Sequence, residues 1–256
     1  MHITQIRNAT LLVEYAGQRF LIDPMLAPKG YHPGFPGTPN SHLNNPLVDL
    51  PLPVEQIVDV DAVVVTHIHA DHWDTFAEQA IAKTLPLFVQ HDRDAAVLQN
   101  AGFEDVRPLL QRTHFAGISL YKTAGQHGSD DVMAVLGERL GEVSGLVLSH
   151  PDEPTLYIAG DTVWNEYVAA ALAQFQPDVI VLNSGDAQAI GLGSIIMNKE
   201  DVAQVYAAAP QATVIASHME AVNHAVLSRT ELRNYLAEQN MLDRVLIPAD
   251  GEVLQF

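Results

Sequence analysis

The chain has 256 residues, of which 48% are hydrophobic and 17% charged, and a chain of this size can bury a substantial core. Its 31 acidic and 13 basic side chains give a formal charge of −18, which argues against nucleic acids and anionic membranes as partners. No apolar run is long enough to span a membrane, and the first residues lack the pattern of a secretory signal. The sequence has no Cys, which excludes disulfides and thiolate ligands and is typical of a cytoplasmic protein. Any transition metal must therefore be bound by Asp, Glu or one of the 12 His.

The first fifth of the chain predicts strands followed by a long irregular loop. Two apolar, β-branched runs flank Ala16-Gly17 between Ile3 and Asp23, which predicts an antiparallel hairpin. The segment 24–53 holds 8 of the 15 Pro residues, so regular structure is not expected there. A lid or substrate loop is favoured over a floppy insertion, because this segment has aromatic and apolar side chains that can pack.

From residue 60 onward, short strands and helices alternate. Strands are predicted over 60–66, 87–90, 106–109, 118–123, 132–135, 145–149, 156–159, 179–182, 213–217 and 244–247. Helices are predicted over 74–83, 94–99, 164–175, 198–208 and 229–239. This order predicts an α/β (α+β) fold, a four-layer αββα sandwich of two mixed β-sheets with helices on the outer faces. No linker or repeat divides the chain, so we expect a single domain over 1–256.

A cluster of metal-ligand side chains follows the predicted strand 60–66 in the segment Thr66-His67-Ile68-His69-Ala70-Asp71-His72. By the period of two in a strand, His67 and His69 are expected to point the same way and to meet at one cation. Asp71 and His72 fall on the turn into the next helix, where they could face a second cation. Imidazole and carboxylate ligands suit zinc, manganese or iron, and binuclear sites of this kind generate hydroxide.

The pattern His67-x-His69-x-Asp71-His72 after an apolar strand resembles the metal-binding signature of the metallo-β-lactamase superfamily. Four further motifs extend the resemblance along the chain: Asp23 at the end of an early strand, Gln126-His127-Gly128, Ala159-Gly160-Asp161-Thr162 and Ala216-Ser217-His218. The resemblance implies two divalent metal ions, zinc or manganese with iron as another option. It implies that His67, His69 and His127 hold one ion. It assigns Asp71, His72 and His218 to the other, places Asp161 between the two, and gives Asp23 a supporting role beside the ligands.

A metal-activated hydroxide could attack a small ester, lactone or phosphodiester, and Asp71 could orient it or move its proton. His224 is the second candidate catalytic residue. It could bind substrate or protonate a leaving group, although a solvated loop residue is an equally good interpretation. It also competes with His218 as the last ligand, and His218 is preferred because it ends a strand. His32 and His42 are weaker candidates for the pocket lining.

Within the superfamily, the motifs Gln126-His127-Gly128 and His218-Met219-Glu220-Ala221-Val222-Asn223-His224 look most like small bacterial metal-dependent hydrolases related to ascorbate-6-phosphate lactonase. A phospholipase D that acts on N-acyl phosphatidylethanolamine is a more distant resemblance. The missing Cys excludes the lactamase class with a Cys ligand, and the charge disfavours the nucleases. We expect a hydrolase of a small molecule, with a homo-oligomer left open. The alternatives are a mononuclear iron oxygenase and a catalytically silent metal-binding protein.

Overall fold

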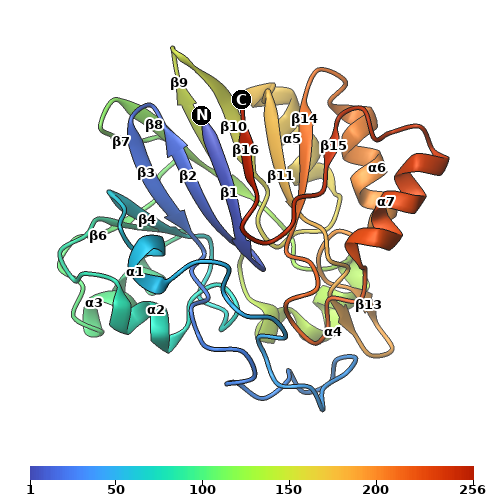
Figure 1. Cartoon of the computed structure of the whole chain (residues 1–256), viewed down its shortest axis with the longest axis horizontal. Coiled ribbons are helices and arrows are strands. Elements are labelled where there is room, and N and C mark those ends of the chain that lie inside the picture. Colours follow the sequence, from blue (N-terminus) through green and yellow to red (C-terminus); the bar gives the residue numbers. More distant parts are fainter.

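Two seven-stranded β-sheets face each other in the computed structural model, which describes residues 1–256 (Figure 1). The strands of the first sheet are, in spatial order, β16 (Val253–Gln255), β1 (His2–Arg7), β2 (Thr10–Tyr15), β3 (Gln18–Ile22), β4 (Ala62–Val65), β5 (Leu87–Val89) and β6 (Val106–Pro108). Those of the second are β15 (Val245–Leu246), β14 (Thr213–Ser217), β11 (Val179–Asn183), β10 (Glu153–Ile158), β9 (Ser144–His150), β8 (Ile118–Ala124) and β7 (Thr113–Phe115). Each sheet combines parallel and antiparallel pairs, so both are mixed.

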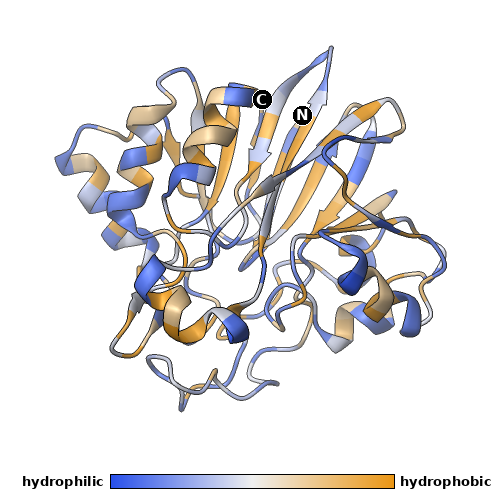
Figure 2. Ribbon diagram, turned by 180° about the vertical axis from the view of Figure 1, so that it is seen from behind, coloured by the Kyte–Doolittle hydropathy of each residue, from blue (hydrophilic) through white to orange (hydrophobic).

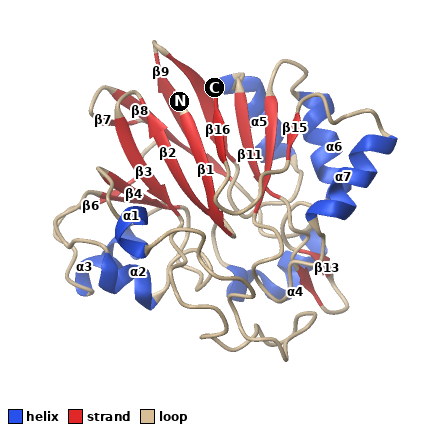
Figure 3. Ribbon diagram, viewed as in Figure 1, coloured by secondary structure: helices blue, strands red, loops and turns tan.

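Helices cover the outer face of each sheet (Figure 3). The first sheet carries α1 (Val54–Ile57), α2 (Thr75–Ala80) and α3 (Asp92–Asn100), and the second carries α5 (Glu166–Phe175), α6 (Lys199–Ala208) and α7 (Arg229–Glu238). The remaining helix, α4 (Asp130–Leu140), packs against the small hairpin of β12 (Gln188–Ala189) and β13 (Gly193–Ser194). This arrangement is the expected αββα sandwich. None of the helices combines the length and the apolarity that a bilayer span requires.

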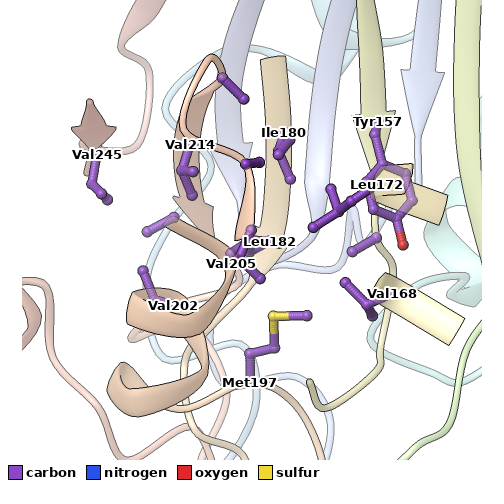
Figure 4. Packing of buried hydrophobic residues seen from close by; sticks show 14 of the residues in the cluster. Tyr157, Val168, Leu172, Ile180, Leu182, Met197, Val202, Val205, Val214 and Val245 are labelled. Carbon is purple, nitrogen blue, oxygen red and sulfur yellow. The ribbon is translucent and has the colours of Figure 1, made fainter. Parts of the chain in front are cut away.

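Three apolar layers hold the sandwich together. Successive side chains of β2 point to opposite faces of the sheet. Leu11 and Val13 therefore join the cluster between the sheets, whereas Leu12 packs under the helices of the first sheet. On the other side, Val168 and Leu172 of α5 pack with Ile180 of β11 in the cluster that Figure 4 shows. The hydropathy colours of Figure 2 agree with this plan, with apolar strands in the interior and polar faces on the outer helices.

The sequence-based assignment of 132–135 as a strand is wrong, because these residues lie in α4. The Ser129 side chain accepts a hydrogen bond from the Val132 amide and caps the helix, and two acidic residues occupy the first turn. Val132 and Leu140 then share a buried face at a spacing of eight residues, which fits a helix. The apolar run 132–135 is too short to distinguish a strand from a helix by itself. The cap at Ser129 is the signal that indicates a helix.

Other elements agree with the sequence-based prediction in part and differ from it in detail. The hairpin at Ala16-Gly17 is confirmed as β2 and β3, but the run before it is two strands, because Asn8 takes a left-handed conformation (φ 56°) and turns the chain between β1 and β2. The capping box of Asn198 and Asp201 is confirmed at the start of α6. Strand β16 was not predicted, and it brings the C-terminus beside β1.

Segment 24–53 contains no helix and no strand beyond an isolated bridge between His32 and Asn45, as its Pro content predicted. Arg7 ties this segment to the end of β1. Its guanidinium is fully buried and donates hydrogen bonds to the carbonyls of Met25 (2.6 Å), Ala27 (2.9 Å) and Val48 (3.1 Å). Burial lowers the pKa of Arg7 to about 10, so the side chain remains charged at neutral pH.

Arg7→Ala is expected to lower the free energy of unfolding by about 3 kcal/mol, because it leaves buried carbonyls without donors. Urea denaturation of the metal-free protein measures this. Arg93 is the control, since its ion pair with Glu142 is exposed and its loss should cost less than about 1 kcal/mol. Equal losses in both variants would contradict a structural role for the Arg7 contacts.

Candidate metal centre

The predicted metal ligands converge where several strands end, at the edge of the sandwich that carries α4 and β13 (Figure 1). The segments concerned follow β3, β4, β8, β10 and β14. Strand ends of one direction meet at one edge, so residues far apart in the chain become neighbours there. All seven predicted ligands are brought together, in sets whose ligand atoms lie within 4.8 Å of one another.

The first set contains His67, His69 and His127. β4 ends at Val65, so His67 and His69 lie on the connection to α2, and the strand period used to orient them does not apply. Their side chains meet nonetheless, with His67 Nε2 3.0 Å from His69 Nδ1. His127 lies on the loop after β8, and its Nδ1 donates a 2.7 Å hydrogen bond to the carbonyl of Ile195. This bond leaves Nε2 of His127 free to face the others.

The second set contains Asp71, His72 and His218. A third set, which contains His67, His72 and Asp161, links these two. His218 Nε2 lies 3.3 Å from Asp71 Oδ2, whereas His224 belongs to none of the three sets. The geometry thus favours His218 over His224 as the last ligand. His218 has a left-handed backbone (φ 58°), and its carbonyl comes so close to Gly185 that a Cβ there would lie 2.1 Å from it. The conformation of His218 therefore requires glycine at position 185.

Asp161 lies between the two sets. Its Oδ2 is 3.1 Å from His72 Nε2, 3.6 Å from His127 Nε2 and 3.8 Å from His67 Nε2, while Oδ1 is 3.8 Å from His218 Nε2. The turn before it depends on Gly160 (φ 71°), where a Cβ would come within 2.4 Å of the Ser144 carbonyl.

Asp23 lies beside the cluster without belonging to any of the sets. Its carboxylate accepts hydrogen bonds from the amide and the hydroxyl of Thr66, both at 2.7 Å, and from His72 Nδ1 at 2.9 Å. The last bond places the proton of His72 on Nδ1 and leaves Nε2 directed at Asp161.

Two asparagines in the cluster were not identified from the sequence. Asn183, at the end of β11, donates a 2.7 Å hydrogen bond to Asp161 Oδ1. Asn8 donates to the Asp71 carbonyl (3.0 Å), and its Nδ2 lies 3.3 Å from His218 Nε2. The position of Asn183 at a strand end was the available signal, since the predicted ligands sit at such ends. Asn8 lies on a turn that the sequence did not indicate.

Burial lowers the pKa values of His67, His69 and His127, whereas those of Asp71 and Asp161 lie well below and that of His72 lies well above the usual range. Burial opposes charge on Asp161, but His72 and His218 hold its pKa well below the usual range. Burial and the neighbouring imidazoles lower the pKa of His67 well below its usual value. For His72, burial acts to lower the pKa, but Asp161 and Asp23 together raise it well above the usual value. Divalent cations bind carboxylates and neutral imidazoles of this kind.

The chemistry of these residues fits divalent cations. Each of the three sets consists only of imidazoles and carboxylates, a donor set that suits zinc, manganese or iron. Nε2 of His72 is buried and lies 3.1 Å from Asp161 Oδ2 without a hydrogen bond of normal geometry, and a cation bound by both groups would satisfy them. A shared Asp161 would allow the seven candidate ligands to bind two cations.

A cavity of about 260 Å³ opens onto the cluster and reaches His69, Asp71, His127 and Asp161. Its walls come from loop 24–53, α4 and the β12–β13 region; the apolar wall residues are Phe35, Pro36, Leu136, Leu140, Ala189, Ile190, Leu192 and Ile195. Arg139 is the one basic residue among the lining side chains. The cavity suits a small, largely apolar molecule.

His224 also lines this cavity, although it is not part of the metal sets. Burial lowers the pKa of His224 to about 4, so its ring is neutral at pH 7. Its Nδ1 is buried without a partner. Neither His32 nor His42 lines the cavity: His32 borders a separate one, and His42 is exposed.

Comparison with known proteins agrees with the geometry. Residues 18–219 match the family model of the β-lactamase superfamily domain. The UPF0173 protein YddR of Bacillus subtilis is 49% identical over 257 residues, and the match covers 100% of both chains. The UPF0173 metal-dependent hydrolase of Rubrobacter xylanophilus is 27% identical, over 72% of this chain and 70% of its own.

Among solved structures, an isothiocyanate hydrolase from Delia radicum gut bacteria is similar over 100% of this chain and 99% of its own, with 49% identity and a TM-score of 0.97. The match of the family model, the shared fold and the full-length relative agree with one another. The chain belongs to the metallo-β-lactamase superfamily and, within it, to the UPF0173 family of metal-dependent hydrolases.

Proposed function

We propose that this enzyme hydrolyses isothiocyanates, or small neutral electrophiles of similar shape, at a centre that holds two divalent metal ions. The observation that carries the proposal is the apolar cavity of about 260 Å³ that opens directly onto the predicted ligands. The similarity to an isothiocyanate hydrolase, at 49% identity over the whole chain, supports the substrate class. Zinc and manganese are the favoured ions, with iron as a further candidate.

The lining of the cavity favours a neutral substrate over a phosphorylated one. Arg139 is its one basic residue, and that side chain is exposed and donates to the carbonyl of Pro36. A phosphate group usually binds several donors or a bidentate Arg. A phosphorylated sugar lactone or a phosphodiester is therefore a weaker candidate than an apolar isothiocyanate, an ester or an unphosphorylated lactone.

The reaction adds one water across the carbon of the isothiocyanate: R–N=C=S and H₂O give R–NH₂ and COS. The C–N bond breaks, and both protons of the water end on the amine nitrogen. When bound, two divalent cations supply a hydroxide nucleophile near neutral pH. His67, His69, His127, Asp71, His72 and His218 would hold the cations, with Asp161 shared.

Other side chains of the site would orient the substrate and the attacking water. Asp71 lines the cavity, and despite its burial the contact with His218 keeps its pKa well below the usual range, so the ionised carboxylate can accept a hydrogen bond from the attacking water and orient it. His224 lines the cavity and its ring is neutral at pH 7, so it can hydrogen-bond to the substrate. Apolar walls would bind the organic group and exclude water around the reacting carbon.

The substrate class is tested with protein loaded with zinc or manganese. We expect turnover of allyl and phenethyl isothiocyanate, measured by loss of isothiocyanate absorbance and release of the amine. A parallel panel of aryl esters, lactones and bis-aryl phosphodiesters is expected to react at least about 10²-fold more slowly in kcat/KM. Faster turnover of a panel compound than of either isothiocyanate would overturn the substrate assignment. Oxygen uptake by protein with a single iron would support the oxygenase alternative.

Asp161→Ala tests the shared ligand. Losing a carboxylate common to both sites should reduce bound metal and lower kcat/KM by at least about 10³-fold. Metal quantification and kinetics on the same sample measure both effects. Asp152 is the control, because its side chain is exposed, and Asp152→Ala should keep metal and activity. Unchanged metal content in Asp161→Ala would contradict the whole ligand set.

His224→Ala and His218→Ala distinguish the two late histidines. His224→Ala should lower kcat/KM by about 10- to 100-fold with unchanged metal content, because a substrate hydrogen bond is lost but no ligand. His218→Ala should lose metal as well as activity. The reverse pattern would show that His224 is the ligand.

A further inference from the structure

Asn223 lies at the contact between loop 24–53 and the segment that carries both late histidines. We propose that Asn223 is a positioning residue: its amide fixes Phe35 and the neighbouring loop residues as the wall of the cavity, and so sets the size of molecule that the enzyme binds tightly. The inference deepens the proposed function and rests on it for the choice of substrates.

The side-chain amide of Asn223 uses its full hydrogen-bonding capacity on this loop. Oδ1 accepts from the Phe35 amide (3.0 Å) and from Asn45 Nδ2 (2.9 Å). Nδ2 donates to Thr38 Oγ1 (2.9 Å) and to the Pro39 carbonyl (2.6 Å). An amide offers two acceptor positions and two donor hydrogens, and all are used here.

The backbone of Asn223 also takes part. Its amide donates to Asn45 Oδ1 (2.8 Å), and its carbonyl accepts from Asn40 Nδ2 (3.2 Å). Asn223 and Asn45 are both almost fully buried, with 1% and 0% of their surface exposed. A buried polar network in which every group is paired favours a single arrangement, because any other leaves polar groups unsatisfied.

The contact connects two parts of the cavity. Phe35 and Thr38 line it from the loop, and His224, the residue after Asn223, lines it next to Phe35. The Phe35 and His224 rings meet edge to face, with centroids 4.9 Å apart and planes at 75°. Asn223 therefore sets the distance between the loop wall and the imidazole that faces the substrate.

A second cavity beside the wall makes this restraint important. It has a volume of about 250 Å³, and Phe35, Pro36 and Ala70 border both cavities. Asn45 borders the second cavity. A wall released from Asn223 has room to move back into this space, which would enlarge the substrate cavity.

Asn223→Ala and Asn45→Ala remove the contact from either side, so the test stands if one variant fails to fold. The control is Asn44→Ala, because Asn44 lies in the same loop but its side chain is exposed and donates only to the Gly30 carbonyl. For Asn223→Ala and Asn45→Ala we expect the KM of methyl isothiocyanate to rise about 10-fold and kcat to change less than about 3-fold. The KM of phenethyl isothiocyanate should change less than about 3-fold, because a larger group still fills the enlarged cavity. Asn44→Ala should match the wild type.

A binding measurement separates this inference from the proposed function. Thiolates bind zinc, so ethanethiol and 2-phenylethanethiol can be titrated into zinc-loaded protein without turnover. Asn223→Ala and Asn45→Ala should bind the small thiol about 10-fold more weakly and the large one with little change, at unchanged metal content. Equal weakening of both thiols, no weakening, or loss of metal would overturn the positioning role. Wild-type protein that discriminates the thiols but turns over no isothiocyanate would contradict only the proposed function.

Discussion

The buried carboxylate of Asp161 is the group on which the site depends. A carboxylate removed from water is costly unless opposite charges and donors surround it, and here His72 and the amide of Asn183 do so. Asp23 fixes the ring of His72 from the opposite side. The sandwich supplies the enclosure, because strand ends from both sheets meet at one edge and place these groups together.

The ligand cluster and the walls of the cavity differ in chemical character. One side of the cavity is polar, with the ligand atoms of each set within 4.8 Å of one another, and the rest is largely apolar. The formal charge of −18 says little about this site, because the cations that it fits would offset the two carboxylates. Part of the apolar wall belongs to loop 24–53, which has no regular structure. Such a loop holds its position through specific hydrogen bonds.

Much of the fold was predictable because its strands and helices carry simple signals in the sequence. Runs such as that of β4 are buried on both faces and read as continuous apolar strands, and the caps of α6 are visible in the sequence. The errors came from short segments: Val132 begins an apolar run that either a strand or a helix could bury, and only Ser129 decides between them. Strand β16 is three residues long and pairs with the other end of the chain, which no local pattern reveals.

The sequence by itself determined the donor set, the order of the motifs and the exclusion of Cys ligands, because these depend only on which side chains are present and on their place in the chain relative to the apolar strands. It also pointed to Asp23, whose carboxylate contacts His72 as expected. Only the tertiary structure decided which nitrogen of each imidazole faces the cluster, because that depends on partners such as the Ile195 carbonyl. It likewise decided the roles of Asn183 and Asn223, since an amide acquires a role only from the groups that folding places around it.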